Sequence, residues 1–192
     1  MSSGEPLVLR GHAALTGVWY PVGSFEEMLR PGCFGRTLGE SPDVVLNLMH
    51  GRGGTGLPLA RTTAGTLTLT EDQRGLFLEA RLDPDDPDSQ LLVRKLARGD
   101  LNGEASFAFN AANQRWSEDY TRRTILTATL HKGDVSVVDF GANENTSVGI
   151  DADVIPRAMV RRPVTLAPLP DHTTAAKARL AALRWANRKA EN

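Results

Sequence analysis

The chain has 192 residues, 41% of them hydrophobic and 23% charged, and a formal net charge of −1. This size and composition predict one domain with a core of ordinary size plus an appendage, and they argue against two full domains. No stretch approaches the roughly 18 apolar residues of a membrane-spanning helix, and the N-terminus lacks the pattern of a cleaved signal, so we expect a soluble protein.

Short stretches with the pattern of β-strands dominate residues 7–150. In residues 66–70 and 76–82 apolar side chains alternate with polar ones, and Gly75 in the connecting segment can adopt a positive φ, so this pair predicts a β-hairpin. The predicted strands span residues 7–15, 44–49, 57–61, 66–70, 76–82, 105–109, 124–130 and 135–140.

Two short helices are expected between the strands, one near residues 34–38 and a clearer one at residues 89–98. The second has apolar residues at helical spacing. Asp86 and Asp88 place a capping carboxylate and negative charge at its N-terminus, and Gly99 can end it.

The composition changes after Ile150. Residues 151–192 contain eight Lys or Arg and four Asp or Glu, a net charge of +4, which leaves 14 and 19, a net charge of −5, for residues 1–150. Four prolines favour an extended linker at residues 151–172, and the pattern of residues 173–192 predicts a basic amphipathic helix. A solvated helix face is the preferred interpretation, and nucleic-acid binding is disfavoured because no patch combines aromatic and basic residues.

Three side chains in the β-rich part could form the catalytic network of a serine protease. His50 follows a predicted strand, Ser106 lies within another, and Asp134 precedes a third. A serine hydroxyl becomes a nucleophile when a base such as histidine takes its proton and a third group orients that base. Strand ends on a rigid scaffold could hold the three groups together, although each could also be an ordinary strand or turn residue.

Other segments resemble ligand-binding motifs but lack required parts. Residues 51–56 match G-x-G-x-x-G, yet no helix follows as dinucleotide binding requires, so a mobile loop beside His50 is the preferred interpretation. Residues 83–88 lack the glycine and distal glutamate of a calcium loop. The four histidines are far apart and have no paired cysteines, so we predict no metal and no cofactor.

Cys33, the single cysteine, cannot form an intrachain disulfide, which fits a reducing cytosol, and its thiol should be buried.

Taken in series, several segments resemble the prohead (capsid maturation) serine proteases of tailed phages. These segments are residues 11–15, 29–34, 46–50, 82–85, 106–109, 133–138 and 141–143. They follow the family's order and cover about residues 7–150, so a protease domain is expected at residues 1–150. The family is related to the herpesvirus assemblins. The resemblance therefore implies a mainly β (α+β) fold with a small closed β-barrel flanked by short helices.

The resemblance also implies roles for the three side chains: His50 as general base, Ser106 as nucleophile and Asp134 as orienting acid. Because assemblins use a second histidine as the third member, His131 is the alternative to Asp134, which is preferred because a carboxylate orients an imidazole well.

The sequence departs from the family's usual pattern at these positions. Glu104 and Ala105 precede the serine where a glycine and a bulky apolar residue are usual, Ala108 replaces a glycine, and the third member is commonly Glu rather than Asp. These departures motivate an alternative function, that of a catalytically inactive prohead scaffold or assembly protein.

The preferred function is that of a serine endopeptidase with an acyl-enzyme mechanism. The resemblance implies that it cleaves scaffold and major capsid protein segments, and itself, inside the assembling prohead in the host cytoplasm. Residues 151–192 would then be a targeting or self-cleaved tail. The sequence is compatible with a homo-oligomer, and no membrane partner is expected. Backbone N–H groups must stabilise the oxyanion, and the turn at residues 141–143 is a candidate site for them.

Overall fold

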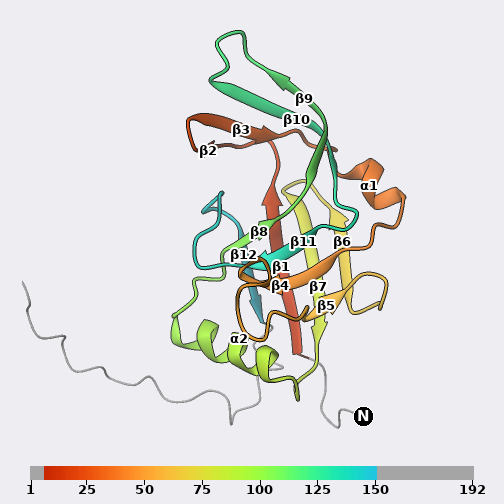
Figure 1. Cartoon of the computed structure of the whole chain (residues 1–192), viewed down its shortest axis with the longest axis vertical. Helices are drawn as coiled ribbons and strands as arrows, with labels where there is room; N and C mark the ends of the chain where they lie inside the picture. Colours follow the sequence, from red (N-terminus) through yellow and green to blue (C-terminus); the bar gives the residue numbers. More distant parts are fainter. Residues whose placement is uncertain (1–6, 151–192) are drawn as a thin grey trace, which may run out of the picture. The chain divides into compact units, whose positions relative to one another are not determined.

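The structure is a computed structural model that describes residues 7–150 (Figure 1). The described part is mainly β with two α-helices, which confirms the predicted fold class. The linker and the basic helix predicted at residues 151–192 lie outside the described residues. No helix in the described part has the length and apolar character needed to span a membrane.

The first sheet has the strand order β12-β1-β7-β6. Strand β1 (Leu7–Leu15) pairs antiparallel with β7 (Gly75–Leu82) and β12 (Ser147–Ile150). Strand β6 (Leu67–Glu71) pairs with β7 and forms the predicted hairpin. The apolar residues that alternate along β7 are buried, as a period of two requires when one face of a sheet covers a core.

The second sheet has the order β5-β4-β11-β8 and holds the segments that the catalytic hypothesis depends on. Strand β11 (Asp134–Val137) lies parallel to β4 (Val45–Leu48) and antiparallel to β8 (Ala105–Phe107). The short strand β5 (Ala60–Arg61) closes the other side of β4. Figure 1 shows β4, β11 and β8 side by side, although their sequences are far apart.

The third sheet has the order β2-β3-β10-β9, and Figure 1 shows it beyond the end of the other two sheets. Its strands are β2 (Trp19–Val22), β3 (Phe25–Leu29), β10 (Arg122–Thr129) and β9 (Asn110–Trp116). A polar network stabilises it: the Tyr20 hydroxyl donates to Glu27 Oε1 at 2.6 Å, and Arg123 Nε donates to Glu27 Oε2 at 2.6 Å. Burial, with this hydrogen bond, raises the pKa of Tyr20.

Both predicted helices are present. Helix α1 (Gly35–Gly39) is short, and helix α2 (Pro87–Arg98) has the expected ends. The Asp86 carboxylate accepts a hydrogen bond from the backbone N–H of Asp88 at 3.0 Å, and Gly99 ends the helix with a φ of 75°. The capping pattern read from the sequence is therefore confirmed.

The closed β-barrel is not confirmed, because strand pairing in the described residues gives three separate four-stranded sheets with open edges. One hydrophobic core nevertheless includes residues from all three sheets. Cys33 belongs to this core and is 1% exposed, and burial raises the pKa of its thiol to about 12. A thiol that stays protonated and inaccessible is a poor nucleophile, so Cys33 is a core residue as expected.

Candidate active site

His50 lies in a strained turn directly after β4. The chain leaves the strand through a single 3-10 turn, Met49–Gly51, in which Met49 and His50 have φ values of 50° and 53°. Left-handed backbone costs a residue other than glycine on the order of 1–2 kcal/mol, and such strain is characteristic of functional sites. The His50 backbone N–H donates to Ser136 Oγ at 3.2 Å, which ties the turn to strand β11.

The His50 imidazole contacts the Asp134 carboxylate. Nδ1 of His50 lies 2.9 Å from Oδ2 of Asp134, and the two side chains are 35% and 14% exposed. Asp134 begins β11 opposite Val45 of the parallel strand β4, so the turn after β4 brings the imidazole back towards it. A hydrogen bond at Nδ1 leaves Nε2 as the ring nitrogen that can exchange a proton with another group.

Ser136 is a further polar residue at this site that the sequence reasoning missed. Its Oγ donates to Asp134 Oδ2 at 2.5 Å and accepts from the His50 backbone N–H, and the residue is 0% exposed. Asp134 and Ser136 are two positions apart on one strand, so they share a face, while Val135 and Val137 face the core. That alternation of polar and apolar residues is the sequence signal that could have identified Ser136.

Ser106 lies on the neighbouring strand, in register with Ser136 of β11. Directly opposed residues of an antiparallel pair lie on the same face of the sheet, with Cβ atoms about 4.5–5.5 Å apart. The half-buried Ser106 is therefore one strand away from the residue that contacts both His50 and Asp134. Within the described residues no hydrogen bond joins Ser106 to His50. Catalytic hydrogen bonds are often long in free enzymes and shorten when substrate binds.

His131, the alternative third member, makes a different contact. It lies between β10 and β11, and its Nδ1 accepts a hydrogen bond from the backbone N–H of Asp43 at 3.3 Å. The hydrogen bond from Arg61 is the main cause that lowers the pKa of Asp43 to about 2. Of the two residues considered for the third role, Asp134 is the one hydrogen-bonded to His50.

The glycine-rich loop after His50 is attached to helix α2. Oδ2 of Asp88 accepts hydrogen bonds from the Thr55 backbone N–H at 2.7 Å and from the Thr55 hydroxyl at 2.6 Å. Gly54, with a φ of 59°, lies so close that a Cβ would be 2.4 Å from Asp88 Oδ1. Asp88, the last carboxylate of the acidic segment at residues 83–88, thus anchors the glycine-rich loop. The described residues contain no group of three or more His, Cys, Asp or Glu side chains that could hold a metal ion.

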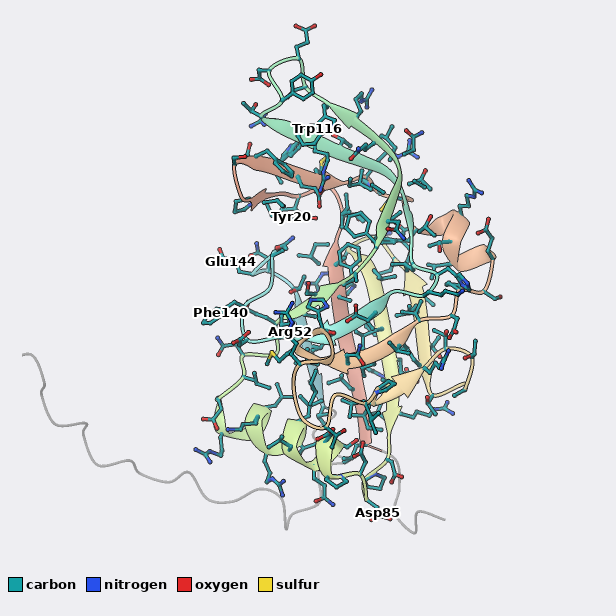
Figure 2. All side chains as sticks on the ribbon, in the orientation of Figure 1. Tyr20, Arg52, Asp85, Trp116, Phe140 and Glu144 are labelled. Atoms are coloured by element: carbon teal, nitrogen blue, oxygen red, sulfur yellow. The ribbon has the colours of Figure 1, made fainter. Side chains whose placement is uncertain are left out.

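The loop between β11 and β12 is tied to the segment that precedes Ser106. The backbone N–H of Gly141 donates to Glu104 Oε2 at 2.7 Å, and that of Val138 donates to the Glu104 carbonyl at 3.0 Å. Glu104 is one of the departures from the usual family pattern, and here it fixes this loop. Figure 2 labels Phe140 and Glu144 on the loop, and Phe140 is 84% exposed.

The chain matches a known protein family. A family model described as caudovirus prohead serine protease matches residues 2–158, a range that contains His50, Ser106 and Asp134. No curated protein and no solved structure matches the chain.

Proposed function

The chain belongs to the caudovirus prohead serine protease family, and from this premise we propose that Ser106, His50 and Asp134 are its catalytic residues. Membership in the family supports a serine peptidase that acts in phage capsid maturation. The observation that carries the assignment is the 2.9 Å contact between His50 Nδ1 and Asp134 Oδ2, next to the strand that bears Ser106.

The mechanism that fits this arrangement begins with attack of Ser106 Oγ on the carbonyl carbon of the scissile peptide bond. His50 Nε2 takes the hydroxyl proton, and the Asp134 carboxylate, which accepts a hydrogen bond from Nδ1–H, stabilises the imidazolium. His50 then returns the proton to the leaving amine, and water hydrolyses the acyl-enzyme by the same steps. Approach of Ser106 Oγ to Nε2 when substrate binds is the rearrangement that this mechanism requires.

The proposed substrates are scaffold and major capsid protein segments inside the prohead in the host cell, together with the chain itself. The family's role in capsid maturation supports this choice. Removal of residues 151–192 by self-cleavage can be tested by mass spectrometry of mature particles. Finding that segment still attached to the protease domain would contradict it.

Covalent labelling tests the assignment of the nucleophile. An alkyl fluorophosphonate is expected to modify Ser106, because a serine beside a histidine–carboxylate pair is activated and this one is half-buried rather than enclosed. Ser136 is 0% exposed and should stay unlabelled. Peptide mapping by mass spectrometry locates the label, and modification of another serine, or no modification of the folded protein, would rule out Ser106.

Replacing Ser136 with alanine tests whether it positions the catalytic pair. We expect kcat for processing of the capsid precursor to fall by about 10- to 100-fold, because hydrogen bonds to charged groups contribute about 1.5–3 kcal/mol and Ser136 donates one to Asp134. It also accepts one from the His50 turn. The matched control is Ser147→Ala, at an exposed position on β12. A change below twofold in Ser136→Ala would show that Asp134 needs no such support.

A further inference from the structure

A small cavity lies beside Ser106. Its volume is about 20 Å³, and residues of β1, β2, β3 and β8 and of the loop between β11 and β12 line it. The walls are largely apolar, with Ala14, Leu29 and Phe107 among them. A cavity needs about 10–15 Å³ on this scale to hold one water, so this one takes a single oxygen-sized group and is too small for a large side chain.

One buried hydrogen-bond donor at this cavity has no partner. Asn143 lines the cavity and is 7% exposed, and its Nδ2 makes no hydrogen bond with any described residue. The orientation of the amide is fixed, because Oδ1 lies 3.1 Å from the backbone N–H of Asn145, a group that can only donate. Buried polar groups are almost always paired, so a donor left free in an apolar site indicates an acceptor that binds there.

The loop that carries Asn143 is fixed relative to Ser106. Thr146 Oγ1 accepts a hydrogen bond from the backbone N–H of Ala105 at 3.0 Å. The same oxygen lies 2.7 Å from the carbonyl oxygen of Ala105 and 2.9 Å from that of Asn143. The two carbonyl groups share the single hydroxyl proton of Thr146 as hydrogen-bond acceptors. Ala105 directly precedes Ser106, so one hydroxyl connects the residue next to the nucleophile with the residue that bears the free donor.

We propose that Asn143 Nδ2 is an oxyanion donor. As Ser106 Oγ bonds to the carbonyl carbon, the π electrons of the C=O bond move to its oxygen, His50 takes the hydroxyl proton, and Asn143 donates a hydrogen bond to the new anion without losing its proton. When the intermediate collapses, the electron pair re-forms the C=O bond, the C–N bond breaks, and His50 protonates the amine. A fixed donor in a largely apolar cavity stabilises such a charge strongly. This inference rests on the proposed nucleophilic role of Ser106.

The rate of phosphonylation by an alkyl fluorophosphonate tests the donor. In that reaction Ser106 Oγ bonds to phosphorus while His50 takes the hydroxyl proton, negative charge develops on the phosphoryl oxygen, and fluoride then leaves. Asn143→Ala and Asn143→Asp should each lower the second-order rate constant by about 100-fold or more, and kcat for the capsid precursor should fall similarly with KM changed only a few-fold. Asn113→Ala, at an exposed position on β9, is the matched control and should react like the wild type.

The outcomes separate this inference from the proposed function. Failure of the wild-type protein to be labelled at Ser106 would contradict the proposed function itself. Labelling of the wild type, with the Asn143 variants reacting within about threefold of it, or a loss confined to KM, would overturn the donor role alone. Asn143→Asp keeps the acceptor that contacts Asn145, so it provides the measurement if Asn143→Ala does not fold.

Discussion

Replacement of Ser106 by alanine is expected to lower kcat for processing of the capsid precursor by about 10⁵-fold or more, to an undetectable level. The reason is that the variant lacks the hydroxyl that would form the acyl-enzyme. The Ser136 hydroxyl and the Cys33 thiol cannot replace the Ser106 hydroxyl as nucleophile, because these residues are only 0% and 1% exposed. Assembly of proheads with the variant, followed by mass spectrometry of the capsid protein, measures the effect.

Two further measurements make this experiment decisive. Ser147→Ala should process the precursor normally, because that serine lies exposed on β12. Thermal unfolding of Ser106→Ala should match that of the wild type, since the substitution removes one hydroxyl from a half-buried position. Unimpaired processing by Ser106→Ala would refute the enzymatic assignment. If the wild type and Ser106→Ala both support prohead assembly and neither cleaves the capsid precursor, the result would favour the inactive scaffold protein.

Replacement of Asp134 by asparagine is expected to lower kcat by about 10⁴-fold. An amide has nearly the same shape, but its NH₂ group favours the wrong tautomer of His50, and it cannot stabilise an imidazolium. The loss should appear in kcat with little change in KM, because Asp134 contacts the base rather than the substrate. Steady-state kinetics on the capsid precursor provides both constants.

His131→Gln tests the alternative third member of the catalytic triad and is to be compared with Asp134→Asn. Its kcat should stay within about threefold of the wild type, because His131 accepts a hydrogen bond from Asp43, and the residue bonded to His50 is Asp134. The opposite pattern, with a large loss in His131→Gln and a small one in Asp134→Asn, would assign the third role to His131.

The parts of the fold that the sequence predicts well are those with local signals. Strand β1 spans residues 7–15 as predicted, and the β6–β7 hairpin and α2 with both its ends were also predicted. Alternating apolar residues, a capping carboxylate and a glycine at a helix end report local structure directly. The strand predicted at residues 57–61 is shorter in the structure, where only Ala60–Arg61 pair.

Strands β2, β3 and β9 escaped prediction because their stability comes from contacts made across the third sheet. Residues 110–115 of β9 are exposed, and their only apolar side chains are those of the small, adjacent Ala111 and Ala112, so the strand has no apolar face to detect. The sheet depends on the pairing of Arg123 with Glu27 and on the stacking of the Arg123 guanidinium over Phe25 and Trp116. Such long-range pairs leave no periodic pattern in the sequence.

The candidate site was only partly predictable for a similar reason. The sequence identifies His50, Ser106 and Asp134 as chemically suitable groups, and the turn at residues 141–143 as a place for oxyanion donors. The contact between His50 and Asp134 depends on the pairing of β4 with β11, which no local pattern reveals. The free donor is visible only once the Asn143 amide is fixed by Asn145 and buried at a cavity.

The parallel pairing of β4 with β11 also determines where the chain can change in length. Asp134 is opposite Val45, and one residue added to or deleted from either strand would move this carboxylate by about 3.3 Å and turn it to the opposite face of the sheet. An insertion in a connecting loop leaves the alignment of the two strands intact. Natural or engineered insertions and deletions inside these two strands are therefore incompatible with the His50–Asp134 contact, as are those in the Met49–Gly51 turn that carries His50, whereas the other loops can change in length.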